Sequence, residues 1–87
     1  MPRPTLLCEL HDYIEIACTF RIPIALSMAS GKELTGIAVD TMVKPDKTEH
    51  LIFIKEGTDE PISLIMNDLI QMRALIENVH FEIVDFK

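Results

Sequence analysis

The fold is decided by the stretch Ile22-Pro23-Ile24-Ala25-Leu26-Ser27-Met28, which is followed by Ala29-Ser30-Gly31-Lys32 and then by Glu33 to Val43. From Ile22 onward the apolar pattern has a period of two, which is typical of half-buried strands. Pro23 has no backbone N–H to donate, so we expect it at the beginning of the first strand. Residues 29–32 predict a tight hairpin turn. Gly36, in the middle of the second strand, predicts a bulge or bend.

Upstream of this hairpin, residues 6–19 carry the 3.6-residue period of an α-helix. Its apolar face is formed by Leu10, Ile14, Ala17 and Cys18. Pro23 disfavours the helical conformation in the residue before it, and β-branched residues follow. We therefore expect the helix to end before Arg21.

Downstream of the hairpin, short strand patterns alternate with turns. A polar loop at 44–49 precedes strands expected at 50–55 and 61–66, a single helical turn at 67–69, a strand at 70–76 and a terminal edge strand at 79–86. The sequence thus predicts an α+β fold that is mostly β. The N-terminal helix, at about 6–19, packs on a small antiparallel β-barrel at about 22–86.

Length and composition limit the class of protein. The chain has 87 residues, of which 48% are hydrophobic, and we expect one domain over residues 1–87. Fourteen acidic and eight basic side chains give a formal net charge of -6, which repels nucleic-acid phosphates. The sequence shows neither a signal-peptide core nor an apolar run long enough to span a membrane. We expect a cytoplasmic protein that binds neither nucleic acid directly nor membranes.

No motif for catalysis stands out. A nucleophile elbow, a phosphate loop and a dinucleotide fingerprint are all missing from the sequence. The zinc-ligating residue types are His11, His50, His80, Cys8 and Cys18, but only Cys8 and His11 have close ligand spacing. We expect a protein without enzymatic activity, metal or cofactor. A small enzyme or metal protein is the alternative that metal analysis would test.

One face of the predicted helix is acidic. Glu9, Asp12 and Glu15 follow one another at i, i+3 spacing, and Ile16 is predicted to project between Glu9 and Asp12. The simpler interpretation is a solvated face with acids near the positive end of the helix dipole. However, the three acids repel one another, and an isoleucine among them has no role in folding if the helix lies flat on the barrel. A basic protein surface with an apolar notch would relieve both costs.

The stretch Cys8-Glu9-Leu10-His11-Asp12-Tyr13-Ile14-Glu15-Ile16-Ala17-Cys18 resembles the C-D-x-Y-D-x-L-E-x-A-C opening of the Rho-binding antiterminator (Rof) family. Residues 31–40 resemble that family's G-E-x-L-x-G-x-A-x-D stretch, and Glu49-His50-Leu51 is similar to its E-Y-L. The chain departs from the family pattern at Glu9, where the family has aspartate, at His11, where it has tyrosine, and at Met66-Asn67.

This resemblance implies an Sm-like barrel whose helix binds the N-terminal RNA-binding domain of the transcription termination factor Rho. The family's acidic contact residues match Glu9, Asp12 and Glu15. Ile16 is our own addition, as is Lys47, chosen because the 44–48 loop is expected to be exposed beside a sheet edge. The implied function is inhibition of Rho by blocking RNA loading. The alternative is an Sm-like RNA-binding module. We expect a monomer or a weak homodimer formed through the 79–86 edge.

Overall fold

The computed structural model describes residues 8–86, with side chains from residue 11 onward. Within this range, helix α1 (Cys8–Phe20) is followed by six strands and one 3-10 turn. The elements after α1 are β1 (Pro23–Met28), β2 (Glu33–Val43), β3 (Glu49–Lys55), β4 (Pro61–Ile65), η1 (Met66–Asp68), β5 (Leu69–Ala74) and β6 (Ile83–Asp85). The prediction of one helix followed by a mostly β domain is confirmed, although residues 6 and 7 of the predicted helix lie outside the described range.

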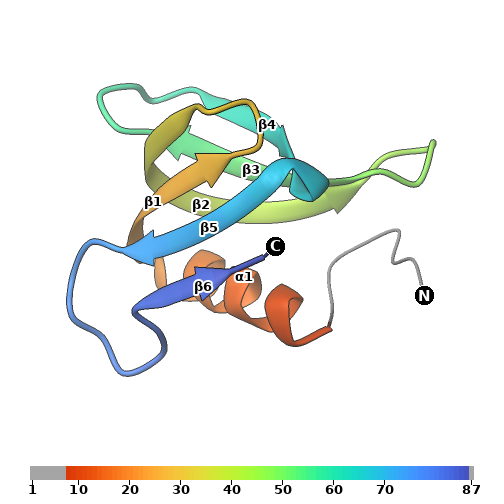
Figure 1. Cartoon of the computed structure of the whole chain (residues 1–87). Helices are drawn as coiled ribbons and strands as arrows, with labels where there is room; N and C mark the ends of the chain where they lie inside the picture. The colour runs from red at the N-terminus through yellow and green to blue at the C-terminus, as the bar shows by residue number, and fades with distance from the viewer. Residues whose placement is uncertain (1–7, 87) are drawn as a thin grey trace.

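The strands form one antiparallel sheet in the order β4-β3-β2-β1-β5-β6. The sheet is bent, and α1 lies across one of its open ends, where it contacts mainly β2 (Figure 1). The predicted closed barrel is not confirmed, because within the described residues no ladder joins β4 to β6. The register of β2 against β3 shifts between Ala38 and Asp40, so the irregularity predicted at Gly36 lies further along the strand.

The C-terminal strand is much shorter than predicted. We expected strand from 79 to 86, but only Ile83–Asp85 pairs with β5, and residues 75–82 form a loop. Asn78 explains the difference, because its side-chain oxygen accepts hydrogen bonds from the backbone N–H groups of His80 (2.8 Å) and Phe81 (3.1 Å). Asparagine side chains stabilise turns in this way, in competition with a strand ladder.

The core lies between the inner face of the sheet and one side of α1. Ile14 and Ala17 on the helix are fully buried, as the helical period predicts. They belong to one apolar cluster with Ile24, Leu26, Ala38, Leu51, Phe53, Leu69, Met72 and Val84 from five strands. This packing fixes the rotation of α1, and the helix therefore turns its polar residues toward solvent.

The helix ends at a left-handed residue. Arg21 has a φ of 52°, and the N–H of Ile22 donates to the carbonyl of Ala17 across 3.2 Å. This is the hydrogen bond of a Schellman motif, in which the left-handed position usually holds glycine. The motif, together with Pro23 two residues later, accounts for the end of the helix at Phe20, one residue beyond the predicted end.

Replacing Arg21 by glycine should stabilise the protein by about 0.5 to 1 kcal/mol, because a side chain in the left-handed conformation costs roughly 1–2 kcal/mol and glycine offsets part of this gain through unfolded-state entropy. Urea denaturation of both proteins measures the difference. As a control, Thr19→Gly, one residue inside the helix end, should destabilise. A loss of stability in Arg21→Gly would mean that the arginine side chain makes an interaction that outweighs the strain.

Candidate protein-binding site

The acidic face of α1 is exposed. Asp12 and Glu15 lie on the side of the helix opposite Ile14 and Ala17, and both are open to solvent. The predicted stripe of acids is therefore present at two of its three positions. The third, Glu9, is in the helix, but its side chain lies outside the described residues. Two carboxylates one turn apart on an exposed helix can approach a basic surface without first losing partners in the core.

Ile16 does not lie freely on this face. Its side chain is half-buried and packs against the hydrophobic core, beside the fully buried Ala17. The argument that an isoleucine here has no role in folding is wrong, because the side chain of Ile16 packs against the core. Only the outer part of Ile16 is available for a partner.

Asp40 extends the acidic surface from the sheet, and sequence reasoning missed it. It is exposed on β2 and borders a shallow hollow between α1 and β2, together with Glu15, Cys18 and Thr19. The strand pattern placed Asp40 on β2 but contained no information about which end of the strand faces the helix. The shift of register next to Asp40 turns this part of β2 relative to β3.

The pKa of the Cys18 thiol is raised in this environment. Burial and, to a smaller extent, the negative charge of Asp40 raise the pKa of Cys18 from 9.0 to about 11, while Arg21 lowers it and Glu15 raises it by still smaller amounts. Two acids from different elements thus act on one group at the helix–sheet junction.

Cys18 should therefore react slowly with iodoacetamide. With a pKa near 11 instead of 9.0, its thiolate fraction at pH 8 is about 100-fold lower, and higher thiolate nucleophilicity recovers roughly tenfold. We expect alkylation at least about tenfold slower than that of free cysteine. The measurement uses the Cys8→Ser variant, so that only one thiol reacts. A rate equal to that of free cysteine, in protein that is still folded, would contradict the raised pKa.

The first turns of α1 are tied to β3 by an ion pair. His11 Nε2 lies 3.0 Å from Glu49 Oε2, and both side chains are partly buried. The pair holds α1 near the hairpin that joins β2 to β3, which brings two candidate contact regions to the same side of the protein.

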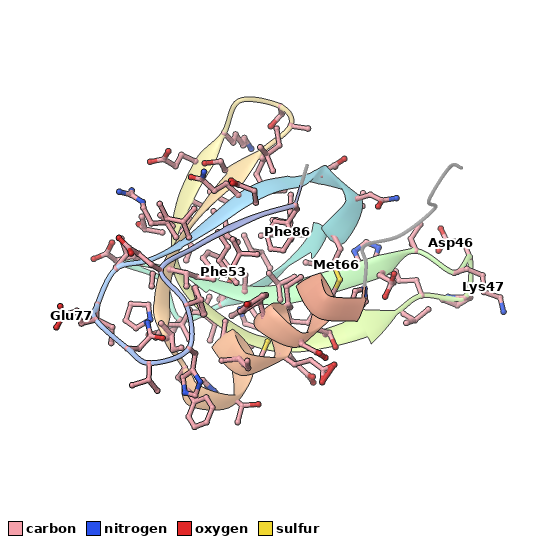
Figure 2. The ribbon with its side chains drawn as sticks, turned by 60° about the horizontal axis from the view of Figure 1, so that its bottom comes forward. Asp46, Lys47, Phe53, Met66, Glu77 and Phe86 are labelled. Carbon is pink, nitrogen blue, oxygen red and sulfur yellow. The ribbon has the colours of Figure 1, made fainter. Side chains whose placement is uncertain are left out.

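Lys47 lies at the tip of this hairpin and points away from the body of the protein (Figure 2). Its φ of 74° and the hydrogen bond from its N–H to the carbonyl of Lys44 fix a tight turn. Asp46 accepts hydrogen bonds from the N–H and hydroxyl of Thr48, which lowers the pKa of its carboxyl group. The predicted exposure of the loop is confirmed.

A buried histidine supports the base of the hairpin. His50 is 9% exposed, and its ring nitrogens lie 3.1 Å from the hydroxyl of Thr48 and 2.8 Å from that of Ser63. The chain of contacts from Asp46 through Thr48 to His50 and Ser63 links the hairpin to the edge strand β4. A loop held in this way offers Lys47 to a partner with less loss of conformational entropy.

The acids Asp12, Glu15 and Asp40 lie on an exposed surface of the protein. Among the residues that the structure describes, His, Cys, Asp and Glu side chains form no group of three or more that could hold a metal ion. The profile of a family described as "Modulator of Rho-dependent transcription termination (ROF)" matches residues 5–86. The chain belongs to the Rof family. A Rof protein modulates Rho-dependent termination of transcription.

A solved structure supports the same assignment. The chain is similar to a protein described as "YaeO bound to Magnesium from Vibrio cholerae O395", with 39% sequence identity and a TM-score of 0.78. The similarity covers 87% of this Rof chain and 96% of the other. Comparison with functionally curated proteins gave no significant match. No helix in the described part of the chain is long and apolar enough to cross a membrane.

Proposed function

We propose that this Rof protein inhibits Rho by binding its N-terminal RNA-binding domain through the acidic face of α1, without catalysis, and so blocks RNA loading. The observation that carries the proposal is the exposed group of Asp12, Glu15 and Asp40 on a chain of net charge -6, in a family of modulators of Rho-dependent termination. Glu9 joins this surface as a proposed contact, and the result is antitermination.

The mechanism follows from the sign of the charges. A site that holds RNA must be electropositive to balance the phosphates. Carboxylates on a rigid helix present negative charge to the same surface, and long-range attraction speeds the encounter. Rof and RNA would then exclude one another by occupying one surface. The exposed part of Ile16 would add an apolar contact at the border of the acidic face.

Lys47 supplies a contact of opposite sign. It extends from the ordered hairpin on the side of the protein to which the His11–Glu49 ion pair holds α1. We place it against an acidic residue of Rho, where it would fix the orientation of an otherwise one-signed interface. Charge pairs of this kind contribute more to specificity than to affinity.

Competition between RNA and Rof for Rho tests the function. Full-length Rho is captured on immobilised Rof and titrated with single-stranded RNA at two salt concentrations. RNA should release Rho, and the dissociation constant should rise about tenfold between 50 and 300 mM NaCl, because salt screens charges over roughly 8 Å. A ternary complex of Rho, RNA and Rof would overturn the proposal of blocked loading.

The same materials test the alternative of an RNA-binding module. The described chain has few exposed cations, and Lys44, Lys47 and Lys55 are separated by acidic or apolar residues. We expect no retention of RNA by Rof alone in a filter-binding assay at low salt. Tight retention would favour the module over the inhibitor.

A further inference from the structure

The loop between β5 and β6 exposes apolar side chains that the proposed Rho contact does not use. Val79 is 95% exposed and Ile76 53%, and Leu75 is exposed beside them. Figure 2 shows Glu77 of this loop and Lys47 at opposite ends of the protein. Adjacent exposed aliphatic side chains in a small protein mark a contact surface more often than scattered single ones do.

The loop holds a defined shape. Asn78 binds three backbone groups, through its side-chain amide to the carbonyl of Ile76 and through its side-chain oxygen to two N–H groups. Phe81 packs edge-to-face on Tyr13 of α1, with ring centroids 6.1 Å apart, and His80 stacks on Phe20 at 4.5 Å. The loop is thus fastened to the helix, and its apolar side chains still point outward. A surface already ordered loses little entropy on binding.

Two neighbouring hollows give this surface its form and charge. One is lined by residues 74–79 with Phe81 and Glu82, and the other runs along β6 and shares Phe81 and Glu82. Their linings include the acids Glu77, Glu82 and Asp85 and no Lys or Arg. Arg73 pairs with Ile83 across β5 and β6 but lines neither hollow. The surface therefore combines exposed aliphatic side chains with acidic ones.

We propose that the 75–82 loop binds a segment of a partner protein that carries aliphatic side chains flanked by Lys or Arg. The aliphatic side chains would fill the hollow beside Val79, and the cations would pair with Glu77 and Glu82 at its border. A second copy of this chain fits poorly, because a two-fold contact would bring the same acids together. An anionic membrane repels these acids as well. The proposal is independent of the Rho contact through α1.

A pair of synthetic peptides tests the recognition chemistry. The full chain, labelled with 15N, is titrated with the peptide RRLLRR and, separately, with RRSSRR, which has the same charge and no aliphatic side chains. We expect RRLLRR to shift the amide signals of residues 74–83 and to bind at least fivefold more tightly than RRSSRR. The peptide EELLEE, which keeps the leucines and reverses the charge, should leave these signals unchanged.

Matched variants locate the contact. Val79→Ser should weaken binding of RRLLRR at least fivefold, and the variant should fold because the side chain packs on almost nothing. Val43→Ser, at an exposed valine on β2, should bind like the wild type. Equal binding of the two arginine peptides, unchanged affinity of Val79→Ser, or shifts confined to the acidic face of α1 would each overturn the proposal.

Discussion

We expect the double variant Asp12→Lys, Glu15→Lys to lose its binding to Rho and to keep its stability. This is the largest functional effect that we predict. Each substitution turns an attraction toward a basic surface into a repulsion, and placing like charges together at an interface costs several kcal/mol. A combined loss of about 3 kcal/mol corresponds to roughly a 100-fold weaker complex. Both side chains are exposed, so the thermal unfolding midpoint should change by no more than a few degrees.

A second double variant separates the position of the charges from their sum. Glu33→Lys, Glu60→Lys changes two exposed acids at the sheet, away from α1. Each acid-to-lysine change raises the net charge by two units. Both double variants therefore carry a net charge of -2, where the wild type carries -6. Isothermal titration with Rho should show near wild-type affinity for the sheet variant. Equal losses in both would assign the effect to net charge, and retained binding by the helix variant would remove α1 from the interface.

The helix and the succession of strands along the chain could be predicted because the two kinds of element have different apolar periods, 3.6 residues in a helix and two in a strand. Burial of Ile14 and Ala17 follows from the helical period, and the start of β1 at Pro23 follows from the missing N–H of proline. The prediction of the last strand was wrong because it rested on the apolar alternation at 79–86. It did not take into account the backbone hydrogen bonds by which Asn78 stabilises a turn. Closure of the sheet could not be predicted, since it depends on how far the two edge strands bend toward one another.

Only the part of the candidate site that lies on α1 could be predicted from the sequence. The spacing of Asp12 and Glu15 placed them on one helix face, where the structure shows them exposed. The sequence could not show that Asp40 of β2 lies across a hollow from Glu15, because this depends on tertiary packing. It also misjudged Ile16, because the packing of this side chain against the core depends on tertiary contacts and not on helical spacing alone.

Gly36→Ala should cause the largest loss of stability among the glycine substitutions. A Cβ atom added at Gly36 would overlap the carbonyl oxygen of Ile54 and lie 3.0 Å from the backbone nitrogen of Glu56, in the adjacent strand and turn. Backbone cannot move aside as a flexible side chain can, so β2 and β3 must separate locally. We expect a loss of about 3 kcal/mol, at the upper end of overpacking costs, and a fall of roughly 12–24 °C in the unfolding midpoint. The glycine predicted as a bend is thus required because two backbones approach closely.

Gly57→Ala is the matched control, because Gly57 shares a positive φ with Gly36 but lacks its close backbone contacts. Gly57 has a φ of 87°, which disfavours a side chain, but nothing lies within 4 Å of the added Cβ. Gly36, at a φ of 159°, also lies in a range that side chains rarely adopt, but it has in addition the overlap with the carbonyl oxygen of Ile54. The control should lose only about 1 kcal/mol. Urea denaturation of the two variants compares them directly. An equal or smaller loss in Gly36→Ala would mean that β2 and β3 yield to the methyl group, and that the close approach of the two strands at Gly36 contributes little to stability.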